Sequence, residues 1–284
     1  MIGPTLTLND GLEIPQFGFG VFCIDGDNAT QQATEEALAQ GYRHIDTAHI
    51  YRNERGVGRA VKNSGIAREE VWITSKLWVN EFNADVAPRA IDEMLQRLDT
   101  DYLDLLLLHR PYGHYVEGYQ AMEDAVRAGK IRSIGLSNFE GAKLQEIIDV
   151  AEIMPSINQI ELHPYWLQSE TKRMMEPYNI AVESWYPLGH GDRELLHLPM
   201  LEEIAQAHNK TVAQVILRWH IQHNHIIFPK STNSEHIREN ADIFDFVLSD
   251  DEMNKIDSLN KNKSYFDISD EEQEKQALSM IVEG

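Results

Sequence analysis

The chain has 284 residues, 42% of them hydrophobic, and a formal net charge of −21. This charge argues against non-specific nucleic-acid binding, because like charges repel the phosphate backbone, and it favours copies kept apart by self-repulsion. The single cysteine, Cys23, excludes an internal disulfide and fits a reducing compartment. The N-terminus has no leader pattern, and no stretch reaches the ~18 apolar residues that cross a bilayer. We therefore expect a cytoplasmic monomer without membrane or nucleic-acid partners.

The first segment predicts a β-hairpin. Residues Thr5–Leu8 alternate polar and apolar side chains, and Leu12–Pro15 form the returning arm. Between them, Asn9, Asp10 and Gly11 supply residues that favour a tight turn.

After the hairpin, a unit of apolar run, loop and amphipathic helix repeats eight times. The runs are rich in Ile, Leu and Val with little polar alternation, which is typical of parallel strands buried on both faces. Several helical patterns end at a glycine, such as Gly41 and Gly129, as helix C-termini often do. Eight units favour an α/β fold of the (β/α)8 TIM barrel type over an open sheet, and no linker divides residues 1–284, so we expect one domain. The runs are Phe17–Phe22, His44–Asp46, Val71–Leu77, Leu103–His109, Ile131–Ser137, Ser156–Leu162, Ala181–Tyr186 and His225–Pro229.

The C-terminal segment predicts one more helix. Ser269 is followed three residues later by Glu272, which is the spacing of a capping box. We expect a helical tail that packs on the barrel or covers its mouth.

Four polar residues stand at or just after the ends of neighbouring runs: Asp46, Tyr51, Lys76 and His109. In a (β/α)8 barrel the C-terminal strand ends share one rim, with neighbouring strands ~4.8 Å apart. Taken singly, an ordinary ion pair, a satisfied histidine or a packing tyrosine explains each residue. Taken together, a carboxylate, phenol, ammonium and imidazole at one rim predict a device that protonates a carbonyl oxygen.

The same segments carry a family resemblance. DTAHIYRNE, ITSKLW, LLLLHRP, GLSNF, NQIELHP, ESWYPLG and FPKSTNSEHIREN resemble the aldo-keto reductase family, in particular its shorter bacterial members that reduce diketo sugar acids and small carbonyls. The resemblance extends from Leu6 to about Leu259. It implies an enzyme that reduces an aldehyde or ketone with hydride from NADPH.

The resemblance also implies a role for each of the four residues. Tyr51 would be the general acid, and Lys76 would favour its phenolate form. Asp46 would keep Lys76 charged and in place, and His109 would position the carbonyl oxygen by hydrogen bonding.

The cofactor site implied by the resemblance lies on the barrel rim. A Rossmann fingerprint is missing, since Gly18–Cys23 has only two of the three glycines and Gly56–Gly58 lies within a helical stretch. Trp185 is the residue that would stack on the nicotinamide ring, and packing in the core is the other explanation for it. For the nicotinamide, the resemblance implies Ser137, Asn138 and Gln159 at the carboxamide and Trp185 against the ring. For the pyrophosphate it implies Leu188 and Gly189, with Asp192 paired to Lys230 across the cofactor. For the 2′-phosphate it implies Lys230, Ser231 and Thr232, with His236 beside them, and for the adenine it implies Glu239 and Asn240.

One cofactor position departs from the family pattern. The family usually has Arg where this chain has His236, and Arg238 lies about 200° further round the helix. A neutral histidine offers a phosphate dianion less than a permanently charged, bidentate arginine. We therefore expect NADPH to be bound and NADH also to be used.

The resemblance places Phe22, Trp78 and His49 in the walls of the substrate pocket. Arg110 stands where the family often has Trp. Two interpretations remain open: Arg110 pairs with a surface carboxylate at the rim, or it clamps the carboxylate of an acidic substrate.

Other functions are less well supported. His220, His223 and His225 cluster, but no further metal motif accompanies them, so we expect no metal site. A redox-sensing regulatory subunit of the same fold is the main alternative, and it predicts an interaction extension or a damaged tetrad. A hydrolase would need paired carboxylates, for which only Asp46 and Glu161 are near candidates.

Overall fold

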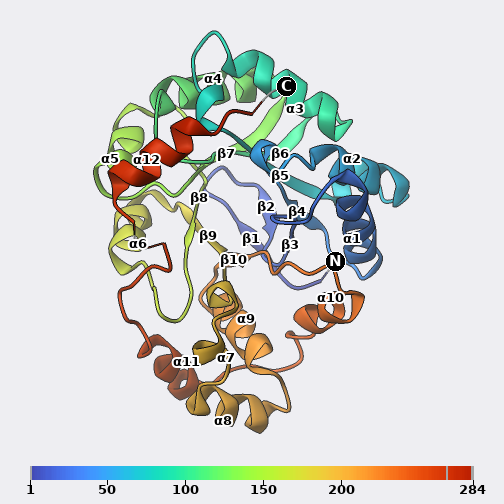
Figure 1. Ribbon diagram of the computed structural model, residues 1–284, viewed down its shortest axis with the longest axis vertical. Helices are drawn as coiled ribbons and strands as arrows, with labels where there is room; N and C mark the ends of the chain where they lie inside the picture. The colour runs from blue at the N-terminus through green and yellow to red at the C-terminus, as the bar shows by residue number, and fades with distance from the viewer. Residues whose placement is uncertain (1, 267, 283–284) are drawn as a thin grey trace.

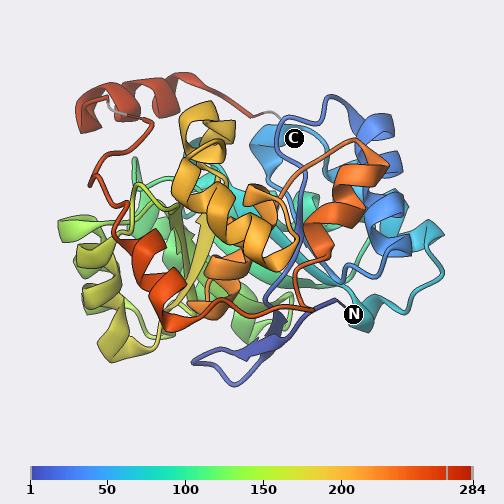
Figure 2. The same cartoon turned by 90° about the horizontal axis from the view of Figure 1, so that it is seen from below.

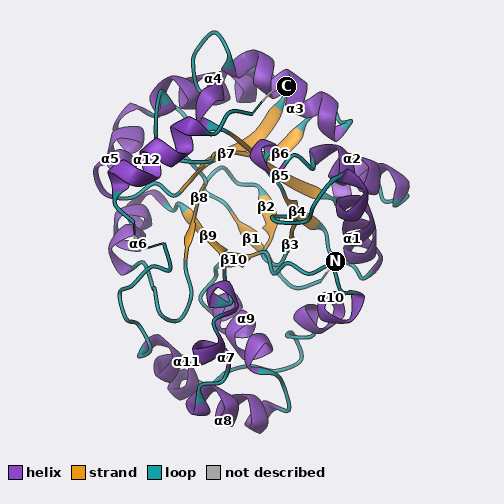
Figure 3. Ribbon diagram, in the orientation of Figure 1, coloured by secondary structure: helices purple, strands orange, loops and turns teal. Residues whose placement is uncertain are grey.

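Eight parallel strands form a barrel that helices surround (Figures 1 and 3). The computed structural model describes residues 2–266 and 268–282. The strands follow one another around the sheet in chain order, from β3 to β10. A parallel bridge between Phe17 and Ile227 joins the two edges, and the Gly18 N–H donates to the Ile227 carbonyl at 2.9 Å. This architecture confirms the predicted (β/α)8 barrel.

Six barrel strands lie where the apolar runs predict them, and the first and last are shorter than expected. The chain leaves the first strand early because it turns at Val21–Ile24, where Cys23 adopts a left-handed φ of 57°. The strands are β1 (Thr5–Thr7), β2 (Glu13–Pro15), β3 (Phe19–Gly20), β4 (His44–Asp46), β5 (Trp72–Leu77), β6 (Leu103–Leu108), β7 (Ile131–Ser137), β8 (Ile157–Glu161), β9 (Ala181–Trp185) and β10 (Ile226–Ile227).

The helices cover the outside of the barrel. The first and fourth are followed by Gly41 and Gly129 at φ 99° and 74°, as predicted. No helix among the described residues is both long and apolar enough to cross a membrane. The helices are α1 (Asp27–Ala39), α2 (Glu54–Asn63), α3 (Ala87–Leu98), α4 (Tyr115–Arg127), α5 (Gly141–Val150), α6 (Ser169–Met175), α7 (Arg193–Leu196), α8 (Pro199–His208), α9 (Val212–Gln222), α10 (Ser234–Ala241), α11 (Asp250–Asp257) and α12 (Asp270–Ser279), with short 3-10 turns η1 (His49–Tyr51), η2 (Arg68–Glu70), η3 (Val79–Glu81), η4 (Glu176–Tyr178) and η5 (Gly189–Gly191).

The hairpin and the C-terminal tail lie at opposite ends of the barrel (Figure 2). Strands β1 and β2 pair antiparallel, and Leu8 and Ile14 pack against apolar side chains of the barrel interior. At the other end, the Ser269 hydroxyl caps α12 by accepting the Glu272 N–H at 3.2 Å. The indole N–H of Trp78 donates to the carbonyl of Met280 at 2.8 Å, which anchors the end of the tail. The predicted hairpin and helical tail are both confirmed.

The glycines of α2 serve packing. A Cβ atom on Gly56 would lie 2.4 Å from the carbonyl oxygen of Asp27, and one on Gly58 would lie 2.4 Å from that of Leu98. Both are backbone atoms that cannot rotate away. Gly56 and Gly58 therefore let α2 approach α1 and the end of α3 closely, and they hold α2 beside the loop that carries Tyr51.

We predict that Gly58→Ala lowers the free energy of unfolding by about 1–3 kcal/mol, because the added methyl group overpacks a backbone contact. Urea denaturation monitored by circular dichroism measures this loss. Arg55→Ala on the exposed face of the same helix is the matched control and should change stability by less than about 0.5 kcal/mol. Equal effects for the two substitutions would contradict the packing role.

Candidate active site

The four residues predicted to act together do converge at one rim of the barrel. Asp46 is the last residue of β4, Lys76 lies near the end of β5, and His109 directly follows β6. Tyr51 ends the short turn η1, which returns the chain over the strand ends. The ammonium of Lys76 lies 5.2 Å from the centre of the Tyr51 ring, and that ring lies 5.6 Å from the His109 ring.

A buried ion pair forms the base of this cluster. The fully buried ammonium of Lys76 donates to both carboxylate oxygens of Asp46, at 2.8 and 2.7 Å, and to the carbonyl of Thr47 at 2.8 Å. Burial alone would lower the pKa of Lys76, but Asp46 and Tyr51 raise it above its ordinary value. Lys76 is therefore a permanent cation beneath the Tyr51 phenol.

Burial is also the main cause of the shifted pKa values of the Tyr51 phenol and the His109 imidazole. It raises the pKa of Tyr51 to about 12, and the charge of Lys76 opposes this shift only in part. The charge of Lys76 lowers the pKa of Tyr51, but burial raises it by more, so the role expected for Lys76 stays a prediction. Burial, together with the charges of Lys76 and Arg110, holds the pKa of His109 well below its ordinary value. At neutral pH the site therefore presents a neutral phenol and a neutral imidazole whose buried Nδ1 has no partner among the described residues.

The predicted nicotinamide residues line the next part of the rim. Asn138, at a left-handed φ of 65°, donates from its amide to the carbonyl of His109 at 3.1 Å and to the hydroxyl of Ser137 at 2.9 Å. The indole N–H of Trp185 donates to the Asn138 side-chain oxygen at 2.8 Å. This contact links the end of β7 to the end of β9 and fixes the Trp185 ring at the mouth, where it is half-buried rather than part of the core.

A buried polar bridge lies below the rim. The side-chain amide of Gln159, on β8, donates to Asp46 at 2.9 Å and to Glu183, on β9, at 3.0 Å. Burial, reinforced by the charge of Asp46, raises the pKa of Glu183 to about 8. Glu183 is therefore a neutral carboxylic acid next to the Lys76–Asp46 pair at neutral pH.

The residues predicted for the 2′-phosphate and adenine are gathered in one exposed region. Lys230, Ser231 and Thr232 form the loop before α10, and the Asn233 side chain caps that helix. His236 lies exposed in its first turns, and Glu239 and Asn240 follow on the same helix. Arg238 extends into solvent, with one nitrogen 3.7 Å from Glu235.

The loop predicted to bind the pyrophosphate has its own internal contacts. Leu188 precedes the turn η5, in which Gly189 has a φ of 60°. Asp192 caps α7 by accepting the Glu194 N–H at 2.7 Å, and it also accepts the hydroxyl of Tyr265 at 2.6 Å. Its expected pairing with Lys230 is not among the contacts of the described residues and stays a prediction.

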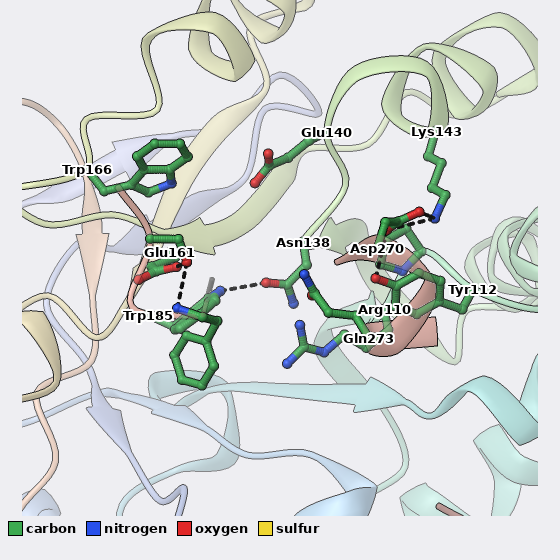
Figure 4. A pocket seen from close by; sticks show the side chains of 13 residues that line it. Arg110, Tyr112, Asn138, Glu140, Lys143, Glu161, Trp166, Trp185, Asp270 and Gln273 are labelled. Carbon is green, nitrogen blue, oxygen red and sulfur yellow. Dashed lines mark hydrogen bonds and ion pairs between the residues drawn. The ribbon is translucent and has the colours of Figure 1, made fainter. Parts of the chain in front are cut away.

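A cavity of about 200 Å³ opens beside the rim, between Trp185, Asn138, Arg110 and α12 (Figure 4). Its carboxylates all have donors. Glu161 accepts from the Tyr265 N–H at 2.8 Å, Glu140 from the Gln168 amide at 2.7 Å, and Asp270 from the Lys143 ammonium at 3.0 Å. Each of these carboxylates is therefore hydrogen-bonded within the protein, and Asp270 is also paired with a cation.

Arg110 differs from these walls. Its guanidinium projects into the cavity, and within the described residues it makes no ion pair and no hydrogen bond. It lies close enough to Tyr51 and His109 for its charge to affect their pKa values. The first of the two open interpretations, a rim arginine paired with a carboxylate, is thus not what the described contacts show.

The three predicted pocket walls lie in different environments. Phe22 is 44% exposed and its ring lies 4.9 Å from that of Tyr51. Trp78 is buried, and its ring lies 5.1 Å from that of His109. His49 is also buried and is paired with Glu81 at 2.7 Å, so it supports the loop under Tyr51.

The clustered histidines belong to packing contacts. The buried rings of His220 and His225 approach each other at 3.2 Å between their Nδ1 atoms, and His220 donates to the carbonyl of Pro187 at 3.0 Å. His223 pairs with Asp257 at 3.0 Å. Among residues 2–266 and 268–282, no group of three potential ligands is arranged to hold a metal ion.

Sequence reasoning missed the groups that complete the site from below and above. Glu183 carried a signal, because it is a charged residue within an otherwise buried strand. Phe266 and Tyr186 carried none, yet their rings stack at 5.7 Å and 14° beside Trp185. The expected tail packs on the barrel or covers its mouth, but no local motif indicates that Phe266, before α12, lies against Trp185 and Tyr186.

Comparisons with known proteins agree with this geometry. A model of the aldo/keto reductase family matches residues 24–261. A glyoxal reductase of Bacillus subtilis (strain 168) is 46% identical over 260 residues, which cover 91% of this chain and 94% of the relative. A methylglyoxal reductase of Yersinia pestis is 41% identical over 263 residues, which cover 92% and 94%.

Solved structures show the same likeness. The crystal structure of an aldo/keto reductase from Brucella melitensis has a TM-score of 0.87 at 44% identity and covers 92% of this chain and all (100%) of its own. An aldo-keto reductase from Bombyx mori, solved in complex with NADP, has a TM-score of 0.89 at 34% identity and covers 96% of this chain and 97% of its own.

Proposed function

We infer the activity of this chain from its family: the chain belongs to the aldo/keto reductase family, whose members are oxidoreductases. We propose that it reduces small aldehydes and ketones to alcohols with NADPH as the hydride donor. The observation that carries this proposal is the convergence of the Tyr51 phenol with the Lys76–Asp46 pair and the His109 imidazole. The alternative of a regulatory subunit is not favoured, because all four groups are present and in contact.

The four residues divide the chemistry of proton delivery. Tyr51 is protonated at neutral pH and gives its proton to the carbonyl oxygen as negative charge develops there, since an alkoxide is a stronger base than a phenolate. Lys76 stabilises the phenolate that remains. Asp46 keeps the Lys76 cation in a buried position that it could not occupy alone.

His109 orients the substrate. Because its pKa is depressed, the imidazole is neutral and binds the carbonyl oxygen by hydrogen bonding without adding a formal charge. Its position between the Tyr51 and Trp78 rings restricts its orientation. The carbonyl oxygen is therefore held between a fixed imidazole and a fixed phenol, which is the geometry that general acid catalysis requires.

The rim residues suit a nicotinamide cofactor. The Gln159 amide gives its N–H groups to Asp46 and Glu183, so its carbonyl oxygen is available to accept from the carboxamide, beside Ser137 and Asn138. The Trp185 ring is fixed at the mouth and offers a flat apolar face. When bound, the cofactor supplies the hydride. Leu188 and Gly189 would lie at its pyrophosphate, and Lys230, Ser231 and Thr232 would hold the 2′-phosphate.

We predict that Tyr51→Phe lowers kcat by roughly 10²- to 10⁴-fold, because the proton donor is lost while the ring is retained. Stopped-flow measurement of NADPH oxidation tests this, and fluorescence titration should show a Kd for NADPH within about threefold of wild type. Tyr112→Phe, which removes a hydroxyl bound to Asp270 in the cavity beside the rim, is the control and should keep most of the activity. Substantial activity in Tyr51→Phe would refute the mechanism.

The proposed cofactor preference depends on His236. We predict that the wild type prefers NADPH over NADH by less than about a hundredfold in kcat/KM, and that His236→Arg raises this preference at least about tenfold through a charge-assisted contact to the 2′-phosphate. Arg238→Ala is the control, because this side chain extends into solvent beside Glu235. A strict wild-type preference for NADPH, or no gain in His236→Arg, would contradict the assignment.

Arg110 points to an acidic substrate. Each of the three carboxylates in the cavity walls already has a donor, whereas the guanidinium of Arg110 has no acceptor among the described residues. A substrate carboxylate would pair with it in a bidentate manner, next to the Tyr51 and His109 rings. We propose small carbonyl compounds that carry a carboxylate as preferred substrates.

The prediction for Arg110→Ala is a loss of roughly 10- to 100-fold in kcat/KM for carboxylate substrates, as expected from the ~1.5–3 kcal/mol of a hydrogen bond to a charged group. Succinic semialdehyde against butanal, and 4-carboxybenzaldehyde against 4-methylbenzaldehyde, are suitable pairs. For the uncharged member of each pair, kcat/KM should change by less than about threefold. Lys143→Ala, which removes a cation already paired with Asp270, is the matched control. Equal losses of kcat/KM for both members of a pair would show that Arg110 does not bind the substrate carboxylate.

A further inference from the structure

The buried carboxyl group of Glu183 has no role in proton delivery, yet it lies within the active-site network. Its β9 position pairs in register with Gln159 on β8, and its side chain is fully buried. One oxygen accepts the Gln159 amide at 3.0 Å, and the other is buried without a partner among the described residues. A buried group that is only half satisfied at this depth calls for an explanation beyond packing.

Gln159 connects Glu183 to the catalytic ion pair. The same amide nitrogen donates to Asp46 on β4 at 2.9 Å, so two carboxyl groups from different strands accept from one NH2 group. With its nitrogen fixed in this way, the orientation of the amide is determined. The carbonyl oxygen, to which no donor is assigned within the described residues, is the end left for a ligand.

We propose that Glu183 is a positioning residue for the nicotinamide: together with Asp46 it holds the Gln159 amide so that its carbonyl oxygen faces the cofactor carboxamide. This inference rests on the proposed function, because it assumes a nicotinamide cofactor at the rim. Glu183 itself touches neither the substrate nor the reacting atoms. It acts through Gln159.

The protonation state of Glu183 matters because of its charged neighbours. Asp46 on β4 and Lys76 on β5 are the charged groups that act on it, whereas β8 contributes the uncharged Gln159 and β10 places Ile226 beside it. Lys76 and Asp46 together are neutral, so a second carboxylate would leave a net buried negative charge. Burial and Asp46 accordingly raise the pKa of Glu183 to about 8.

Ionisation of Glu183 should slow carbonyl reduction. Below its raised pKa the carboxyl group is neutral and the Lys76 charge is balanced by Asp46 alone. Above it, an additional negative charge opposes the negative charge that develops on the substrate oxygen. The rate of carbonyl reduction should therefore fall as the pH rises through about 8.

Two substitutions separate the roles of Glu183. Glu183→Leu removes the acceptor and the titrating group, and it should raise the Kd for NADPH roughly 5- to 10-fold, as expected for loss of a hydrogen bond that orients a binding group. Glu183→Gln retains an acceptor oxygen and removes the titration. It should recover most of the NADPH affinity lost in Glu183→Leu, and the limb near pH 8 should disappear from its pH profile of kcat/KM.

The experiment titrates NADPH by fluorescence and measures kcat/KM from pH 6 to 10 in wild type and both variants. Glu123→Gln, at a buried carboxylate that accepts two backbone N–H groups far from the site, is the control and should keep the wild-type limb. If Glu183→Leu does not fold, the pH profile of Glu183→Gln decides alone. An unaltered limb in Glu183→Gln, or unchanged NADPH affinity in a folded Glu183→Leu, overturns the proposal. Absence of NADPH oxidation in the wild type would instead refute the proposed function.

Discussion

The ion pair between Lys76 and Asp46 is the interaction on which the rest of the site depends. Two charges taken out of water cost several kcal/mol each, and this cost is offset only when geometry and hydrogen bonding are nearly complete. Here the Lys76 protons reach both Asp46 oxygens and the Thr47 carbonyl, and Asp46 accepts a further bond from Gln159. The barrel supplies this arrangement because its strands present alternate side chains to one enclosed interior.

The pair also contributes to the pKa values of the groups around it. Its cation partly opposes the effect of burial on Tyr51, and it helps to keep His109 neutral. Its anion contributes to keeping Glu183 protonated. Burial thus keeps Tyr51, His109 and Glu183 uncharged at neutral pH, and the ion pair opposes this effect at Tyr51 and adds to it at His109 and Glu183.

The sequence predicts the barrel, and it also predicts that Asp46, Tyr51, Lys76 and His109 lie together at one rim, because both depend on short-range patterns. Apolar runs such as Leu103–Leu108 are long enough to indicate buried strands, and strand ends in a parallel barrel meet at one rim. The short strands β3 and β10 were predicted too long, since Val21 and Phe228 are apolar and buried without being part of a strand. Contacts set by tertiary structure were missed for another reason. The Gln159 bridge and the stacking of Phe266 on Tyr186 join segments between 24 and 113 residues apart in the chain, and no local pattern encodes them.

The charge of the chain explains why the departures from the family pattern matter. An acidic protein has no general attraction for an anionic cofactor or substrate, and beyond about 8–10 Å its surface charges are largely screened. Binding must therefore come from local cations and oriented N–H groups. On α10, His236 and Arg238 stand among Glu235 and Glu239. At the proposed 2′-phosphate site, one arginine fewer would therefore remove a large share of the available positive charge. In the cavity, Glu161, Glu140 and Asp270 each accept a hydrogen bond from within the protein. The guanidinium of Arg110 has no paired carboxylate among the described residues, so it is the cation left there for an anionic substrate.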